Sequence, residues 1–131
     1  MSETKKPLLL VVEDDEVFYT ALQIKFEKEN YEVEVGKDGE EGLSLALKKH
    51  PDIILLDILM PRMNGMELLK KLREDSWGKT VPVVIMTNIS TDNDQQINNV
   101  IDTQPSYYLI KSNTDIEEVV DKVKELLHPS E

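Results

Sequence analysis

The sequence predicts an α/β domain: a doubly wound, five-stranded parallel sheet with helices on both faces. Short apolar runs alternate along the chain with amphipathic stretches of helical period, which favours successive βαβ units. Three of these runs are almost continuously apolar, as expected of parallel strands that are covered on both sides. The five runs cover residues 8–12, 31–35, 53–56, 83–86 and 107–110.

The stretches between these runs have the spacing of amphipathic helices. In the first, Val17, Ala21 and Ile24 mark the expected apolar face, with Phe18 and Leu22 beside it. Leu43, Ala46 and Leu47 have similar spacing in the second helix, and Met66, Leu69 and Leu72 have it in the third. The last helix has the longest such series: Ile116, Val119, Val120, Val123, Leu126 and Leu127.

Polar residues predict where two of these helices begin. Thr114 followed by Glu117 fits a capping box before the last helix, and Asp38 with Glu41 fits the same device before the second. The stretch Thr91–Val100 is mostly polar and predicts only a short helix. The sheet is therefore expected to carry five helices, of which the fourth is the weakest.

Length and charge limit the classes of function. A chain of 131 residues fits one domain, since domains commonly have ~100–150 residues. We expect a single domain over residues 1–131, with its core at about 7–128 and no effector domain. The 26 acidic and 15 basic residues give a net charge of −11, which argues against binding nucleic acid or an anionic membrane over a broad surface.

Residue types that the chain lacks exclude further functions. There is no cysteine, which rules out disulfides, thiolate zinc sites and a cysteine nucleophile. Its two histidines make a multi-histidine metal site a poor hypothesis. No apolar run is long enough for a signal peptide or a membrane span, so we expect a cytoplasmic protein.

Chemically active side chains follow four of the five apolar runs. Glu13 and Asp14 follow the first, Asp57 ends the third, Thr87 follows the fourth and Lys111 follows the fifth. The carboxyl ends of parallel strands meet at one edge of a sheet, which is where such folds bind ligands. The sequence therefore predicts three carboxylates, a hydroxyl and an ammonium at one rim.

This set of groups suits phosphoryl chemistry at a magnesium site. Neighbouring carboxylates repel one another unless a hard cation neutralises them, and Mg²⁺ prefers oxygen ligands. A carboxylate in such a site can accept a phosphoryl group, while Lys111 and Thr87 could contact the phosphoryl oxygens. Asp15 has an equally good alternative role as the N-cap of the next helix.

The sequence resembles the receiver domains of two-component response regulators, of the CheY-like type. Four motifs carry the resemblance in the family's order and cover nearly the whole chain: LLLVVEDD, DIILLDILMPRMNG, VPVVIMTN and YYLIK. The segment Asp57–Gly65 is the most specific of them. The resemblance implies a flavodoxin-like fold with strand order 2-1-3-4-5. Because only one predicted helix follows Lys111, we expect a stand-alone receiver, with a receiver excised from a larger regulator or hybrid kinase as the alternative.

The resemblance also implies a role for each matching residue. Asp57 would be the phosphoacceptor, and Glu13, Asp14, Asp57 and the backbone carbonyl of Leu59 would hold Mg²⁺. Lys111 would pair with the phosphoryl group. The remaining positions would be Thr87 and Tyr108 as switch residues, and Pro61 and Gly65 as residues that shape the loop after the acceptor.

The implied function is a phosphorylation-dependent switch rather than an enzyme. A sensor histidine kinase or phosphotransfer protein would phosphorylate Asp57, and a downstream protein would contact the face of the fourth helix, fifth strand and fifth helix. A homodimer through the same face is a further expected partner arrangement. No direct contact with nucleic acid or membrane is expected.

Two alternatives remain at this point. Ser112 and Asn88 replace the family's more usual proline and small residue, which leaves open an atypical receiver that acts as an interaction module without phosphate. A flavodoxin-like binder or enzyme is the other alternative. It would need a phosphate-cradling loop after the first strand, where this chain has Glu13–Glu16.

Overall fold

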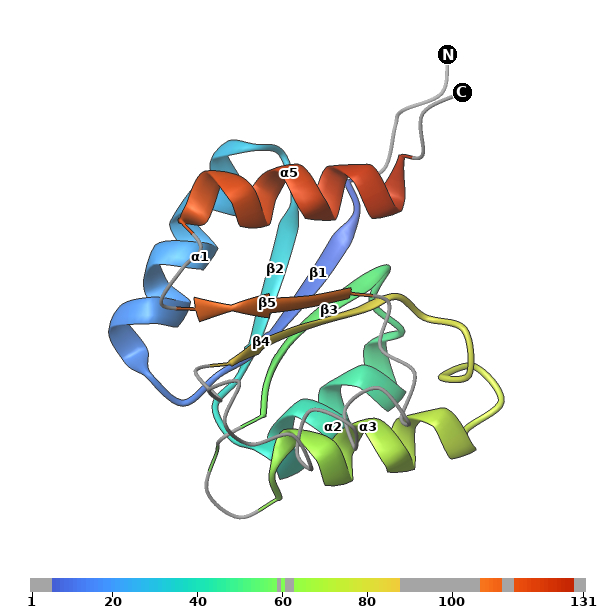
Figure 1. Ribbon diagram of the computed structural model, residues 1–131. Coiled ribbons are helices and arrows are strands. Elements are labelled where there is room, and N and C mark those ends of the chain that lie inside the picture. The colour runs from blue at the N-terminus through green and yellow to red at the C-terminus, as the bar shows by residue number, and fades with distance from the viewer. Residues whose placement is uncertain (1–5, 59, 61–62, 88–106, 112–114, 129–131) are drawn as a thin grey trace.

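The computed structural model describes residues 6–58, 60, 63–87, 107–111 and 115–128 (Figure 1). Its strands are β1 (Leu8–Val12), β2 (Glu32–Gly36), β3 (Ile53–Asp57), β4 (Val83–Thr87) and β5 (Tyr107–Ile110). Its helices are α1 (Glu16–Lys28), α2 (Gly39–Lys49), α3 (Gly65–Glu74) and α5 (Ile116–Leu127). The short helix expected over Thr91–Val100 lies outside the described residues, as do Leu59, Pro61, Asn88 and Ser112.

The five strands form one parallel sheet in the order β2-β1-β3-β4-β5, which confirms the predicted fold class and strand order. β1, β3 and β4 lie inside the sheet, and every described side chain of β3 is buried. This is why the central runs are continuously apolar, since each strand has a helix layer on either side.

The helices form two layers that bury the two faces of the sheet (Figure 1). On one face α1 and α5 enclose a core that includes Leu22, Phe26 and Val123. On the other face α2 and α3 enclose a core that includes Ala46, Leu69 and Leu72. The site described below lies at the end of the sheet, between the two layers.

The apolar face predicted for α1 is wrong in part. Val17 is 81% exposed and Ile24 is 51% exposed, whereas Leu22 and Phe26 are completely buried. The buried face is therefore turned away from the stripe that Val17 and Ile24 form. Helical spacing alone could not tell the buried face from the exposed stripe, because apolar residues occur on both sides of this helix.

The predicted N-cap of α2, Asp38, is confirmed, whereas the predicted N-cap of α5 is one residue too early. The Asp38 carboxylate accepts from the Glu41 backbone N–H, and the Glu41 carboxylate accepts from the backbone N–H of Lys37. At α5 the cap is Asp115, not Thr114, and a capping box joins Asp115 to Glu118. Asp has the same capping chemistry as Thr, so the motif was right and its register was not.

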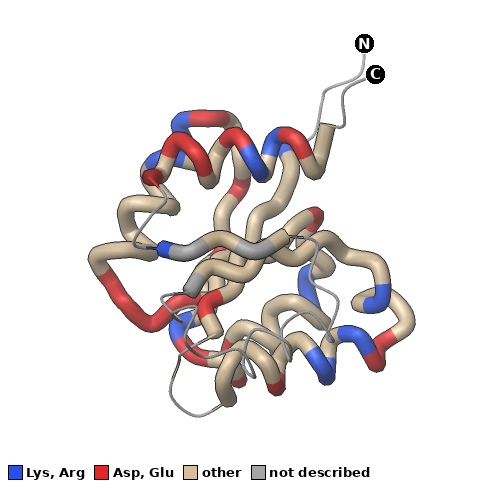
Figure 2. The backbone as a smooth tube through the Cα atoms, in the orientation of Figure 1, with Lys and Arg blue, Asp and Glu red and all other residues tan. Residues whose placement is uncertain are grey.

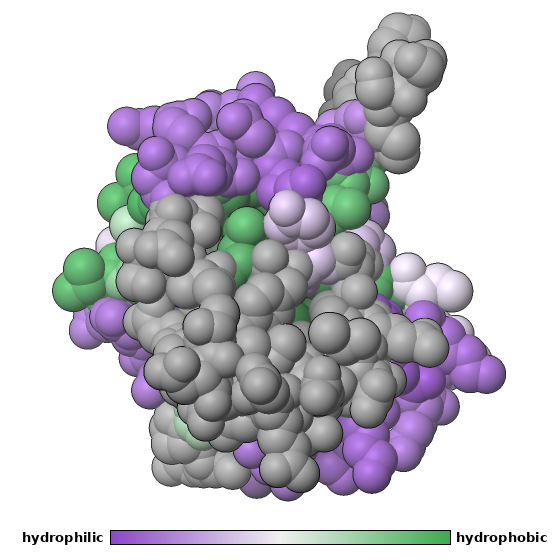
Figure 3. All heavy atoms as spheres, in the orientation of Figure 1, coloured by the Kyte–Doolittle hydropathy of each residue, from purple (hydrophilic) through white to green (hydrophobic). Residues whose placement is uncertain are grey.

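Charged residues gather on the helices and loops, and the outward surface of α5 is hydrophilic (Figures 2 and 3). Its exposed positions include Glu117, Asp121 and Lys124. Within the part of the chain that the structure describes, no helix is both long and apolar enough to cross a membrane.

Candidate functional site

The register of the sheet determines which side chains meet at its carboxyl end. Val12 lies opposite Leu56, so the next residues, Glu13 and Asp57, are neighbours across β1 and β3. Asp57 lies opposite Met86 in β4, and the next residue of β4 is Thr87. Thr87 lies opposite Ile110 in β5, and Lys111 follows Ile110 in the chain. Four neighbouring strands thus bring the predicted positions to one edge.

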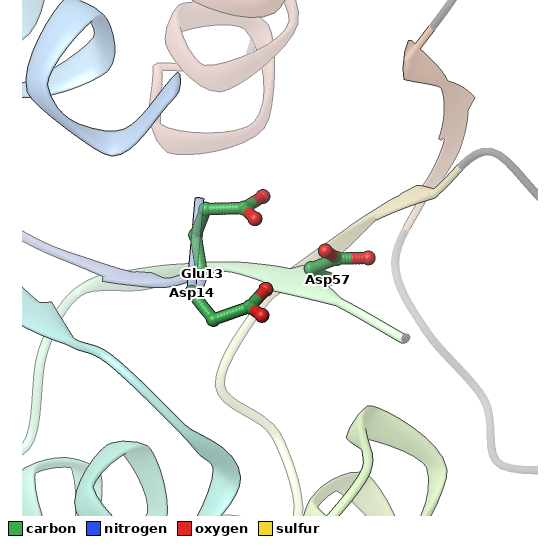
Figure 4. A group of neighbouring side chains, drawn as sticks. All are labelled: Glu13, Asp14 and Asp57. Carbon is green, nitrogen blue, oxygen red and sulfur yellow. The ribbon is translucent and has the colours of Figure 1, made fainter. Parts of the chain in front are cut away.

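Three carboxylates form an acidic cluster where β1 and β3 end (Figure 4). Glu13, Asp14 and Asp57 each offer an oxygen, and these oxygens lie within 4.8 Å of one another. Glu13 is 2% exposed and Asp57 is 6% exposed, while Asp14 is open to solvent. The cluster therefore has a buried floor and one solvent-facing side, through which a small ligand could enter.

Lys111 balances part of this negative charge. Its Nζ donates to Glu13 Oε1 at 2.9 Å and lies 3.6 Å from Asp57 Oδ2. Burial disfavours the ammonium, but the hydrogen bond to Glu13 and the charges of Asp57 and Glu13 outweigh it and raise the pKa of Lys111 above its ordinary value. The lysine is therefore fully protonated at neutral pH.

Local structure fixes the backbone on both sides of the cluster. Asp15 is the N-cap of α1, as one reading of the sequence had it, and its backbone N–H donates to Glu13 Oε2 at 3.0 Å. Gly65 begins α3, and its backbone N–H donates to the Ile58 carbonyl oxygen at 2.9 Å. A Cβ at Gly65 would lie 2.5 Å from the Asp57 carbonyl oxygen, so only glycine allows this close approach.

The remaining predicted site residues are described only in part or not at all. Thr87 and Tyr108 occupy the expected strands, but their side chains lie outside what the structure describes. Leu59 and Pro61 are outside the described residues altogether. One neighbour was not predicted as part of the site: the ring of Phe18, whose centroid is 4.4 Å from Lys111 Nζ.

The donor set of the cluster fits a small hard cation. Carboxylate oxygens are the ligands that Mg²⁺ prefers, and Mg²⁺ commonly keeps several waters, which the exposed side at Asp14 would admit. Sulfur and imidazole ligands, which softer metals prefer, do not occur in the cluster. The arrangement thus combines a buried carboxylate, an ammonium beside it and room for a metal.

Comparison with known proteins assigns the family. The family model of the response regulator receiver domain matches residues 9–124. The chain belongs to this family. The receiver domain is 32% identical to the structure of the Francisella response regulator 1452 receiver domain, with a TM-score of 0.81, covering 93% of this chain and 97% of that one. It is 26% identical to the chemotaxis response regulator CheY4 of Vibrio cholerae, with a TM-score of 0.84 over 93% of this chain and 99% of that one.

Among curated proteins, the receiver domain is similar to the response regulator ArlR of Staphylococcus saprophyticus. The two are 33% identical over 119 residues, which is 91% of this chain and 51% of the relative. The same response regulator of Staphylococcus aureus, strain Mu50, is 32% identical over 119 residues, which is 91% of this chain and 52% of the relative. The chain thus spans about half the length of these relatives.

Proposed function

We propose that this receiver domain is a phosphoacceptor switch of a two-component system, phosphorylated on Asp57. The observation that carries the proposal is the environment of that carboxylate. Asp57 is 6% exposed, belongs to a cluster of three carboxylates, and has an ammonium 3.6 Å from its Oδ2. A buried acid with this surrounding is suited to nucleophilic attack on a phosphoryl group that brings its own negative charge.

The proposed donor is a phosphohistidine of a sensor histidine kinase or phosphotransfer protein. A carboxylate oxygen of Asp57 attacks phosphorus, so that an O–P bond forms while the N–P bond breaks. The electron pair of that bond stays on the histidine nitrogen. Lys111 holds positive charge beside the attacking carboxylate throughout, which lowers the cost of bringing the phosphoryl oxygens close to three acids.

The residues that would hold Mg²⁺ are Glu13, Asp14, Asp57 and the backbone carbonyl of Leu59. When bound, the metal neutralises the carboxylates and the phosphoryl oxygens. Glu13 accepts a hydrogen bond from Lys111 Nζ, so one acid connects the proposed metal site with the ammonium. Pro61 and Gly65 would shape the loop after the acceptor.

The proposed output is a change in a protein-interaction face. A phosphoryl group on Asp57 would draw Thr87 and Lys111 toward it, Tyr108 would follow, and an existing equilibrium between two conformations would shift. A downstream protein, or a second copy in a homodimer, would contact β5, α5 and the helix expected over Thr91–Val100. The protein would act in the cytoplasm as a switch, whose only catalysis is its own phosphorylation and dephosphorylation.

Incubation with acetyl phosphate and Mg²⁺, followed by intact-mass measurement, tests the proposal. The unchanged protein should gain one phosphoryl group, and Asp57→Asn should gain none. Asp14→Asn should gain it more slowly, because a metal ligand is lost. If the folded, unchanged protein gains no phosphoryl group, the atypical receiver that works without phosphate becomes the better hypothesis.

A further inference from the structure

The Phe18 ring closes one side of the space around Lys111. The ammonium has Glu13 Oε1 at 2.9 Å, Asp57 Oδ2 at 3.6 Å and the Phe18 ring centroid at 4.4 Å. The Lys111 side chain is only 14% exposed. Because an ammonium over an aromatic face is attracted by the ring's electrons, and more strongly where water is excluded, this contact restrains Nζ as well as covering it.

Four contacts join Lys111, Glu13, Asp15 and Phe18 into a closed circuit. One oxygen of Glu13 accepts from Lys111, and its other oxygen accepts from the Asp15 backbone N–H at 3.0 Å. Asp15 Oδ1 in turn accepts from the backbone N–H groups of Val17 and Phe18, at 3.1 and 3.4 Å, which sets the first turn of α1. The ring carried by that turn lies against Lys111, so the helix cap and the lysine position depend on each other.

We propose that Phe18 is a positioning residue for phosphoryl transfer, which holds the Lys111 ammonium beside Asp57 through a cation–π contact. The inference rests on the proposed function, since it concerns the lysine that would meet the phosphoryl group. A lysine side chain has four rotatable bonds, and an ammonium that is already held beside Asp57 needs less reorganisation to reach the phosphoryl group when it arrives.

An aromatic ring suits this position better than either an acid or an aliphatic side chain. A carboxylate in place of the ring would compete with the phosphoryl oxygens for the ammonium. An aliphatic group would exclude water but would not attract the charge. The ring attracts the ammonium without a directional acceptor, so the N–H donors stay available to Glu13, Asp57 and the incoming oxygens.

Stepwise fluorination of Phe18 tests the proposal. Fluorine withdraws electron density from the ring face while changing its shape little, so packing is kept and the cation–π attraction is weakened. The rate of phosphorylation by acetyl phosphate with Mg²⁺ should fall progressively along the series from phenylalanine to trifluorophenylalanine, by roughly three- to tenfold in total. Phe18→Leu should lower the phosphorylation rate by a similar factor. Phe18→Tyr should keep most of the rate of the unchanged protein, because the aromatic face is retained.

Phe26 is the matched control, because it is the other phenylalanine of the chain and lies on the same helix as Phe18. Its ring is fully buried and packs against the ring of Tyr31. Fluorination there should leave the rate unchanged. A flat series at Phe18, in protein that is still phosphorylated on Asp57 and has an unchanged melting temperature, would overturn the positioning role alone. Absence of phosphorylation in the unchanged protein would instead overturn the proposed function.

Discussion

Replacing Asp14 by Asn should stabilise the protein when no divalent cation is present. Asp14 has two carboxylate neighbours, with oxygens within 4.8 Å. At that separation two like charges cost about 0.9 kcal/mol in water, or about 1.7 kcal/mol for the two pairs. Attraction to Lys111 and screening by salt offset part of this, so Asp14→Asn should raise the free energy of unfolding by about 1 kcal/mol. The melting temperature should then rise by about 3–5 °C.

In saturating Mg²⁺ the unchanged protein should instead be more stable than Asp14→Asn. A ligand that binds only the folded state stabilises it by about 2.7 kcal/mol at 100 times its dissociation constant, and the variant would lack a ligand for the metal. Denaturant unfolding in EDTA and in saturating Mg²⁺ provides the measurement. Glu74→Gln is the control: it removes the same charge from the exposed far end of α3 and should change stability by less than about 0.5 kcal/mol under both conditions. The reasoning is refuted if Asp14→Asn is less stable in EDTA, or if Mg²⁺ stabilises both proteins equally.

Three further predictions concern the supports of the site and of the fold. Gly65→Ala should lower the free energy of unfolding by about 1–3 kcal/mol and slow phosphorylation, because its methyl group would lie 2.5 Å from the Asp57 carbonyl oxygen; an unchanged melting temperature would contradict this. Asp115→Ala should cost about 1 kcal/mol in denaturant unfolding, and Thr114→Ala clearly less, whereas equal losses would argue against the Asp115 cap. Burial raises the pKa of Tyr31, so the folded state keeps a proton that the unfolded chain loses above a pH of about 10. Stability should therefore fall as pH rises past that value, and less steeply in Tyr31→Phe; identical slopes would exclude this contribution.

The fold and the acidic cluster could be predicted because both depend on repeating patterns. Continuous apolar runs such as Ile53–Leu56 indicate covered parallel strands, and parallel strands end at a common edge. Any acid placed directly after such a run must therefore lie near that edge. This is why Glu13 and Asp57 could be brought together without knowledge of a single distance.

Features that depend on the third dimension were missed or misplaced. Phe18 was taken only as a neighbour of the apolar face of its helix, and its contact with Lys111 depends on how α1 is turned against the sheet. Trp77, in the loop after α3, is half-buried, and its ring stacks on the His50 ring with centroids 4.4 Å apart, a pairing that no local pattern indicates.

The most direct test of the central claim identifies the residue that carries the phosphoryl group. After phosphorylation with acetyl phosphate and Mg²⁺, borohydride reduces an aspartyl phosphate to homoserine, which peptide mass mapping can locate. We predict homoserine at position 57 in the unchanged protein and at no position in Asp57→Asn. Modification at another acid, such as Asp14, or none in folded protein, would contradict the assignment of Asp57 as the phosphoacceptor.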